Sequence, residues 1–209
     1  MRAILIGNKI LDYTLTDKQL KFINDSDVII RNNRLNNIRQ TGNRIDVWWV
    51  DICRDFFNLF DKSIDISGVK DIYLNKYGSY CLDHYPHFKA AFVKTFKNTN
   101  LNKQAVIHKS PNKYSHFELN NHPEWWPINN PIENKTAATT AIICLSHMIE
   151  IYKDYDFYVF GMDIDNRGQL FKELSMWKNS WHANAGEYEE RYLKELLSVG
   201  KIKDFEKSW

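Results

Sequence analysis

The stretch Arg2-Ala-Ile-Leu-Ile-Gly-Asn8, at the start of the chain, decides the fold. Its apolar run, Ile4 to Ile6, is typical of a strand that is buried on both faces of a parallel sheet. Gly7 allows a sharp turn at the carboxyl end of this strand, and Asn8 presents an amide there. Ligands of open α/β sheets bind at the carboxyl ends of the strands, so both residues are candidate ligand contacts. A plain turn after a strand is the alternative.

Two later apolar runs also end in polar residues. They are Asp27–Ile30, followed by Arg31-Asn-Asn33, and Asp156–Phe160, followed by Gly161-Met-Asp163. Because the carboxyl ends of parallel strands meet at one edge of a sheet, we expect both clusters to lie near Asn8. Amide side chains, an arginine and the helix start at Thr136 favour anionic oxygens. The phosphate-binding patterns GxxxxGK[ST] and GxGxxG are absent from the sequence, so we expect side-chain amides to bind a nucleotide.

Helix and strand patterns alternate along the rest of the chain. Thr16 suits the N-cap of a helix over 16–23, and Thr136 opens a helical pattern that runs to Ile149. Further strands are predicted over 44–50, 69–74, 104–108 and 202–205, and further helices over 54–60, 85–96 and 187–199. This alternation predicts an α/β fold with a mainly parallel sheet flanked by helices. We expect a single Rossmann-like domain over 1–209, with a short lid over 164–182.

Length and composition exclude several classes of protein. The 209 residues fit one sizeable domain, and a net charge of +2 gives no reason to expect a nucleic-acid partner. Cys53, Cys81 and Cys144 are widely spaced, which argues against a disulfide framework and a thiolate zinc site. Met1 directly precedes the first strand, and no apolar stretch is long enough to cross a bilayer. We therefore expect a cytoplasmic protein with no signal peptide and no transmembrane segment.

The irregular stretch from Ser110 to Pro131 contains the run Pro-Glu-Trp-Trp-Pro over 123–127. Aromatic rings in such a loop can line a cleft, so we predict that Trp125 and Trp126 contact an acceptor sugar. A loop that merely covers the sheet is the alternative.

His182 is the candidate catalytic base. It lies between the predicted lid and the start of the last helix, and a neutral imidazole can accept a proton from an alcohol. A capping or surface role is the alternative. Other histidines lack the HExxH spacing, so we expect no zinc site. Asp163-Ile-Asp165 has the form of a manganese-binding pair, which leaves a metal-dependent sugar-nucleotide transferase as another alternative.

Five segments resemble, in chain order, the motifs of sialyltransferases. They are Ile4–Asn8, Val28–Asn33 with the following Gly42–Asp46, Thr136–Ala138, Phe157–Asp163 and His182–Leu193. These segments are most similar to the bacterial lipooligosaccharide sialyltransferases, glycosyltransferase family 42. The resemblance implies a GT-A variant of the Rossmann-like fold. It also implies an inverting, metal-independent transfer of sialic acid, or a related acidic sugar, from a CMP-activated donor to a glycan hydroxyl.

The resemblance gives roles to particular residues. His182 would be the catalytic base, and Asn8 and Asn33 would contact the CMP part of the donor. The full set of expected donor-binding residues is Gly7, Asn8, Arg31, Asn33, Thr136, Ala137, Ala138, Gly161, Asp163 and Arg167. The partners would be the CMP-sugar and the glycan acceptor, with no cofactor because the CMP-sugar is a substrate. A homo-oligomer and a peripheral position at the inner face of the membrane stay open.

Two features differ from the family. Its tyrosines after Gly-x-Asp hold the donor phosphate, whereas Asp165, Asn166 and Arg167 occupy that region here, and the lid is short. We assign the phosphate contact to Arg167 or Lys172 instead. Two alternatives remain open: a nucleotide or pterin pyrophosphokinase that uses ATP and magnesium, and a nucleotide-sugar-binding module without activity.

Overall fold

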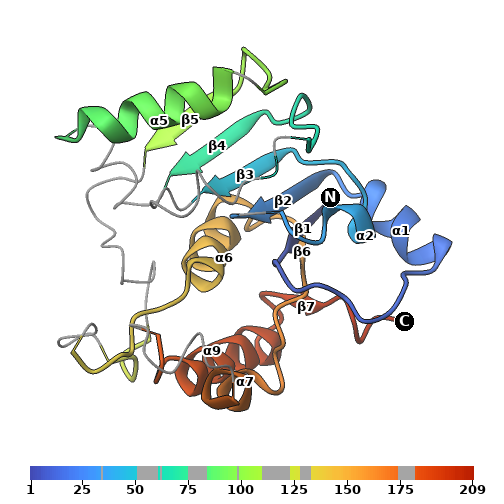
Figure 1. Cartoon of the computed structure of the whole chain (residues 1–209). Coiled ribbons are helices and arrows are strands. Elements are labelled where there is room, and N and C mark those ends of the chain that lie inside the picture. The colour runs from blue at the N-terminus through green and yellow to red at the C-terminus, as the bar shows by residue number, and fades with distance from the viewer. Residues whose placement is uncertain are drawn as a thin grey trace.

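The computed structural model of the chain describes residues 1–33, 35–50, 61, 63–74, 84–97, 99–109, 123–127, 133–173 and 182–209. Seven strands form one sheet, all parallel, in the order β5-β4-β3-β2-β1-β6-β7 (Figure 1). The strands are β1 (Arg2–Ile6), β2 (Val28–Asn32), β3 (Val47–Val50), β4 (Asp71–Leu74), β5 (Val106–Lys109), β6 (Asp156–Phe160) and β7 (Lys203–Asp204). The described helices are α1 (Asp17–Asn24), α2 (Ile38–Thr41), α5 (Pro86–Lys97), α6 (Thr140–Ile151), α7 (Arg167–Glu173) and α9 (Gly186–Ser198).

Alternate side chains of the central strands point into two separate hydrophobic layers. On β1, Ala3 and Leu5 pack in the layer that contains residues of α6 and α9. Ile4 and Ile6 pack in the layer on the opposite face, which contains residues of α1. Successive side chains of a strand point to opposite faces of the sheet. Because helices cover both faces here, the side chains on both sides of β1 are apolar. The fold is therefore a parallel sheet between helices, as the sequence predicts.

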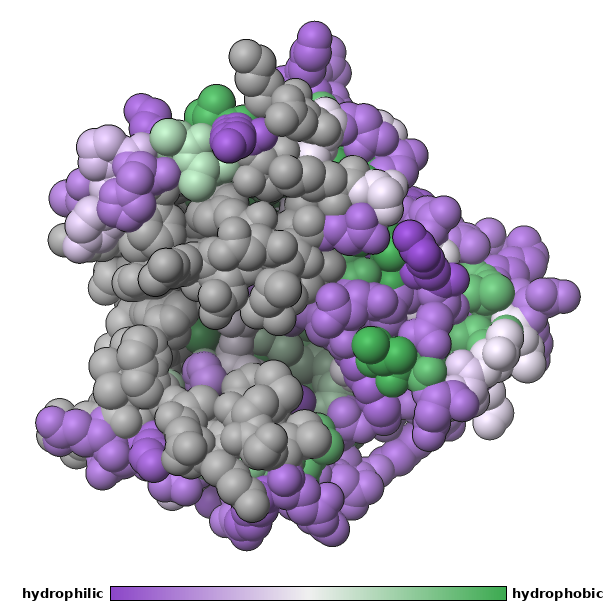
Figure 2. Space-filling model, in the orientation of Figure 1, coloured by the Kyte–Doolittle hydropathy of each residue, from purple (hydrophilic) through white to green (hydrophobic). Residues whose placement is uncertain are grey.

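The face that carries α1 also carries α5, farther along the sheet. Trp48 of β3 and Phe96 of α5 belong to one buried cluster, and their ring centroids are 5.7 Å apart. Trp48 pairs in register with Arg31 of β2, so it lies on the same face as the α1 layer. Among the described residues in view, Figure 2 shows a largely hydrophilic surface with hydrophobic residues in small groups.

The start of α1 confirms the N-cap that the sequence predicts. The Thr16 hydroxyl accepts a hydrogen bond from the Gln19 amide at 3.3 Å, and the Gln19 side chain accepts one from the Thr16 amide at 2.9 Å. These reciprocal contacts form a capping box, which satisfies amide groups that have no partner inside the helix. The strand predicted over Asp156–Phe160 is β6, with the same bounds.

The helix predicted to open at Thr136 begins at Thr140 instead. Thr139 is its N-cap and has extended backbone angles, φ −71° and ψ 157°. The Thr139 amide donates 2.6 Å to a carboxylate oxygen of Glu189, a residue of α9. A buried partner from another helix thus fixes Thr139 in an extended conformation, and no local sequence signal reports that partner.

Other element bounds moved by a few residues. The strand predicted from Arg44 begins at Val47, and directly before it the Asp46 carboxylate accepts from the Ile29 amide at 2.9 Å. The helix predicted over 54–60 lies outside the described residues, as does the 174–181 part of the predicted lid. Most of the described part of the lid forms α7, which lies beside α9 (Figure 1). No helix in the described ranges combines the length and apolarity needed to cross a bilayer.

Replacing Gly7 by alanine is expected to destabilise the fold. A Cβ atom at Gly7 would lie 2.4 Å from the carbonyl oxygen of Gly161, so β1 and β6 would have to separate. The expected loss is about 1–3 kcal/mol of unfolding free energy, measured by urea denaturation. At Gly68 a Cβ would meet its nearest atom, the Ile45 oxygen, at 3.6 Å. Gly68→Ala is the matched control, and an equal loss in both variants would contradict this account.

Candidate functional site

The order of the strands reverses at β1. Strands β2 to β5 extend from one side of β1, and β6 and β7 lie on the other. The chain leaves β1 toward α1 on one face of the sheet, and leaves β6 toward α7 and α9 on the other. The crevice outside such a reversal, at the carboxyl ends of the strands, is where ligands bind in open α/β sheets. The loops after β1 and β6 therefore define the candidate site.

Gly7 and Gly161 bring these two loops into contact. The Gly7 amide donates to the Phe160 carbonyl at 2.8 Å, which continues the β1–β6 ladder by one residue. Gly161 has φ +66°, a conformation that favours glycine. Neither position accommodates a side chain without strain, and the backbones approach closely as a result.

Lys9 and Asp163 join the same two loops by an ion pair. The Lys9 side chain is 34% exposed and that of Asp163 is 24% exposed, so solvent reaches both. Asp163 has φ +50°, which a non-glycine residue seldom adopts. The pair raises the pKa of Lys9 against the opposing effect of desolvation. Strained backbone of this kind concentrates at binding sites, which supports a functional interpretation of the loop.

Asn37 fixes the loop that follows β1. Its amide nitrogen donates to the carbonyl oxygens of Gly7 at 2.7 Å and Lys9 at 2.8 Å, and the residue is buried. Asn8 lies between these two anchored carbonyls and is partly exposed. The Asn8 side chain has no hydrogen-bond partner within the described part of the chain, so its amide can contact a ligand.

The Arg31 side chain is buried and binds oxygen atoms of the protein. Its guanidinium donates to the Thr41 hydroxyl at 2.7 Å and to the carbonyl oxygens of Thr41, Gly42 and Arg44 at 3.2, 2.5 and 3.1 Å. Burial lowers the pKa of this guanidinium. Because neutral oxygens already occupy its N–H groups, Arg31 holds the connection between α2 and β3 in place. Arg31 is 1% exposed, so its guanidinium is not presented to a ligand from solvent.

Four buried side-chain polar atoms of the described chain have no hydrogen-bond partner. They are Asn32 Oδ1, Trp49 Nε1, Trp126 Nε1 and Thr136 Oγ1. Asn32 and Trp49 pair in register on neighbouring strands, and Trp49 belongs to the layer that contains α6. Since buried polar groups are nearly always satisfied, unpartnered ones mark places where a ligand or water binds. Sequence reasoning missed Asn32, although alternation along β2 places it opposite Arg31.

Asn33 follows β2 with φ +50° and has its backbone fixed on β3. Its amide donates to the Trp49 carbonyl at 2.8 Å, and its carbonyl accepts from Trp48 Nε1 at 2.8 Å. This conformation suits asparagine better than most residues, since its side chain can bond locally to the backbone. Asn33 is therefore placed at the expected edge of the sheet.

His182 lies against the extended segment that precedes α6. Its Nδ1 is 2.5 Å from the carbonyl oxygen of Ala137. A carbonyl oxygen only accepts hydrogen bonds, so Nδ1 carries the proton and Nε2 carries the lone pair of the neutral ring. Asn184 extends the same contact: its amide donates to Lys135 O and its side chain to Asn134 O, both at 2.8 Å.

The predicted residues Thr136, Ala137 and Ala138 are all buried. They lie in the segment before the N-cap Thr139, and not in the first turn of α6. The N-terminus of α6 was the expected anion site, but the Glu189 carboxylate occupies it through the Thr139 amide. Glu189 also pairs with Arg167. Both the helix terminus and this arginine are thus already neutralised inside the protein.

Trp125 and Trp126, which were predicted to contact the acceptor sugar, pack mainly against other residues of the protein. Trp126 is 3% exposed and belongs to the hydrophobic layer with α6 and α9. The Trp125 ring lies under the Arg191 guanidinium at 4.1 Å from its centroid, and its Nε1 donates to Glu195 at 3.1 Å. Trp126 has no free face for a sugar, whereas Trp125 is partly exposed.

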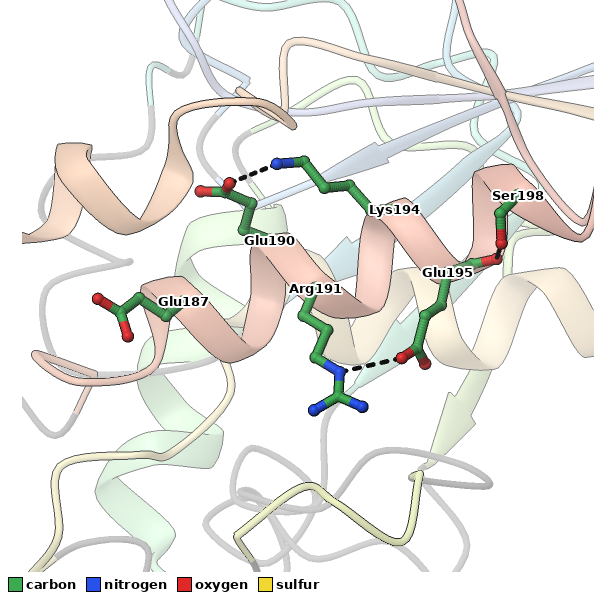
Figure 3. Close-up of a pocket in the computed structure, with 6 residues that line it drawn as sticks. All are labelled: Glu187, Glu190, Arg191, Lys194, Glu195 and Ser198. Atoms are coloured by element: carbon green, nitrogen blue, oxygen red, sulfur yellow. Dashed lines mark hydrogen bonds and ion pairs between the residues drawn. The ribbon is translucent and has the colours of Figure 1, made fainter.

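Two hollows of nearly equal size differ in chemistry. One, of about 390 Å³, runs along α9 and is lined by its residues Glu187, Glu190, Arg191, Lys194, Glu195 and Ser198 (Figure 3). Figure 3 shows that Glu190 faces Lys194 and that Arg191 faces Glu195. The nitrogen–oxygen distances in these two ion pairs are 2.6 and 3.0 Å. Such i,i+4 pairs are typical of a solvated helix face. This hollow therefore gives no sign of a ligand.

The second hollow, of about 380 Å³, adjoins the His182 segment. It is lined by residues of several segments, including Asn134, Thr136, Lys172, Asn184 and Tyr188. Amides, a hydroxyl, an ammonium and an aromatic ring are groups that bind sugars and phosphates. Lys172 pairs with Glu187, but both side chains are 68% exposed, so the pair is weak and can open. The chemical groups that line this hollow, and not its volume, make it a better candidate ligand site than the hollow along α9.

Among the described residues, no group of three or more His, Cys, Asp or Glu side chains is close enough to hold a metal ion. Comparison with protein-family models finds no match, and comparison with characterised proteins finds no relative.

Replacing Asn37 by alanine is expected to loosen the loop after β1. The change leaves the Gly7 and Lys9 carbonyls without their buried donor, which costs about 1–3 kcal/mol of unfolding free energy. Gln40→Ala is the control, because its amide bonds Leu11 at a partly exposed site where water can replace it. Urea denaturation measures both variants. A loss for Asn37→Ala no larger than that for Gln40→Ala would show that the loop is held by other contacts.

Proposed function

We propose that the chain is a glycosyltransferase that transfers sialic acid, or a related acidic sugar, from a CMP-activated donor to a glycan hydroxyl. The observation that carries this proposal is the contact of His182 Nδ1 with the Ala137 carbonyl at 2.5 Å. That contact leaves Nε2 as the proton acceptor of the neutral ring, as a general base requires. The choice of CMP and of sialic acid is supported by the motif resemblance to sialyltransferases, and so is the GT-A variant of the fold.

The proposed reaction is a single displacement. His182 Nε2 accepts the proton of the acceptor hydroxyl while its oxygen attacks the anomeric carbon of the donor. The bond from that carbon to the CMP phosphate oxygen breaks, CMP leaves with the electron pair, and the configuration inverts. No metal ion takes part in the proposed displacement.

The donor nucleotide is assigned to the edge of the sheet at the strand reversal. Asn8 supplies a partly exposed amide there, beside the close contact of Gly7 and Gly161. Asn33 directly follows β2, and Thr136 lies in the segment before α6. Of the two cations considered for the leaving phosphate, Arg167 is paired with Glu189 in the interior. Lys172 is therefore the better candidate, since it is exposed and lines the hollow beside the His182 segment.

CMP is expected to bind and stabilise the protein. A ligand at one hundred times its dissociation constant adds about 2.7 kcal/mol, which thermal-shift and calorimetric titrations detect. Asn8→Ala should weaken CMP binding by roughly 1–3 kcal/mol, because an amide contact is lost. Asn102→Ala is the control, since this residue lies in the loop before β5, at the opposite end of the sheet. A shift with ATP and magnesium, and none with CMP, would favour a pyrophosphokinase instead.

Replacing His182 by alanine should remove the general base and leave the binding of CMP unchanged. Turnover is expected to fall by about two to four powers of ten, the usual contribution of a positioned general base. The affinity for CMP should stay close to that of the wild type, because His182 contacts the acceptor hydroxyl. Steady-state rates and calorimetry measure these quantities, with His87→Ala of α5 as control.

Near-normal turnover of His182→Ala would exclude His182 as the base. CMP binding without turnover in the wild type, across acceptors, would favour a binding module without activity.

A further inference from the structure

Arg167 and Glu189 form a buried ion pair that no part of the proposed reaction uses. The Glu189 residue is 0% exposed and Arg167 is 7% exposed. Arg167 Nε donates to Glu189, Nη1 donates to the Met162 carbonyl at 2.8 Å, and Nη2 donates to the Thr139 hydroxyl at 2.9 Å. Each N–H direction of the guanidinium thus meets a different segment of the chain. A pair that is buried this deeply is retained only where its hydrogen bonds are satisfied.

The carboxylate completes the same network from α9. One oxygen of Glu189 accepts from the Thr139 amide at 2.6 Å, and the other lies 3.1 Å from the Thr139 hydroxyl. Thr139 is the N-cap of α6, a helix of 12 residues, so the carboxylate lies at the positive end of the helix dipole. An anion of the protein itself occupies this position, and the phosphate of a ligand is excluded from it.

The network reaches both halves of the proposed site. Thr139 lies two residues after Ala137, whose carbonyl holds the His182 ring. Met162 lies directly after Gly161, which contacts Gly7 at the strand reversal. The pair therefore links the loop that holds the base to the loop that borders the donor nucleotide. Because these loops belong to different elements, their separation is not fixed by either element alone.

We propose that Glu189 and Arg167 are positioning residues that set the placement and the tautomer of His182 relative to the donor site. This inference rests on the proposed function of His182 as the base. The ion pair acts through Thr139 on the segment that carries the Ala137 carbonyl, and so keeps the proton on Nδ1 and the lone pair on Nε2. A displacement of that segment would weaken the contact of His182 Nδ1 with the Ala137 carbonyl and change the orientation of the imidazole ring.

The test is Glu189→Gln, which keeps the shape of the side chain and removes its charge. Turnover is expected to fall by about 10- to 100-fold, as for the loss of other groups that orient a catalytic residue. The dissociation constant of CMP should be unchanged. In nuclear magnetic resonance spectra of the His182 ring nitrogens, the variant should lose the preference for the Nδ1–H form that the Ala137 contact imposes.

Glu190→Gln is the matched control. Glu190 neighbours Glu189 on α9 and also binds α7, through the Gly168 amide at 3.0 Å, but it has no described contact with α6. This variant should keep the turnover, the CMP affinity and the His182 tautomer of the wild type. Equal changes in both variants would overturn the inference, because they would report general damage to α9. Wild-type turnover and tautomer in Glu189→Gln would overturn it as well.

Thr139→Val takes the place of Glu189→Gln if that variant does not fold. It removes the hydroxyl that contacts both partners and leaves both charges, and the same changes in turnover and tautomer are expected. If the wild type shows no transfer activity, the proposed function fails, yet the tautomer comparison still decides whether Glu189 and Arg167 position His182. An unaltered tautomer in Thr139→Val would then overturn the inference.

Discussion

The close approach of β1 and β6 is the constraint on which the rest of the structure depends. The ladder continues one residue past β1, from the Gly7 amide to the carbonyl of Phe160, and this close approach requires glycine at position 7 because a Cβ atom there would lie 2.4 Å from the Gly161 carbonyl oxygen. The two strands lie side by side although about 150 residues separate them in the chain. Their loops then lead to helices on opposite faces of the sheet, the arrangement at which open α/β sheets bind their ligands.

Internal charges shape the candidate site as much as the backbone does. The two arginines that sequence reasoning assigned to a ligand bind protein oxygens instead, Arg31 near α2 and Arg167 at the start of α6. A guanidinium with several donors can hold several segments at once, which suits it to this structural use. The cations that remain accessible at the described site are ammonium groups, those of Lys9 and Lys172. Amides and ammonium groups, and not arginines, are thus the groups available to a ligand.

Local patterns predicted the elements well. The apolar run that ends in Gly7 and the run over 156–160 are strands β1 and β6, and the Thr16 cap is formed as expected. These features depend on neighbours in the sequence, so a single sequence contains their cause. The alternation of helices and strands predicted the parallel pairing, whereas the order of the strands comes from the structure alone.

Features that depend on distant partners could not be predicted. The start of α6 moved because Glu189, some fifty residues away, binds the Thr139 amide. Trp126 looked available for a sugar, but its ring is enclosed by α6 and α9. Asn32 was overlooked because only the pairing of β2 with β3 shows which layer it faces. In each case the deciding contact joins segments that local sequence does not connect.

The central claim is that a nucleotide binds at the carboxyl edge of the sheet, where β1 and β6 meet. Titrating isotope-labelled protein with CMP, while following the backbone amide resonances, tests it most directly. The account predicts that the largest changes fall on residues 7–9, 161–163 and 182–184, with the loop over 99–105 at the opposite edge unaffected. Changes centred on that opposite loop or on the charged face of α9, or no change at saturating CMP, would contradict it.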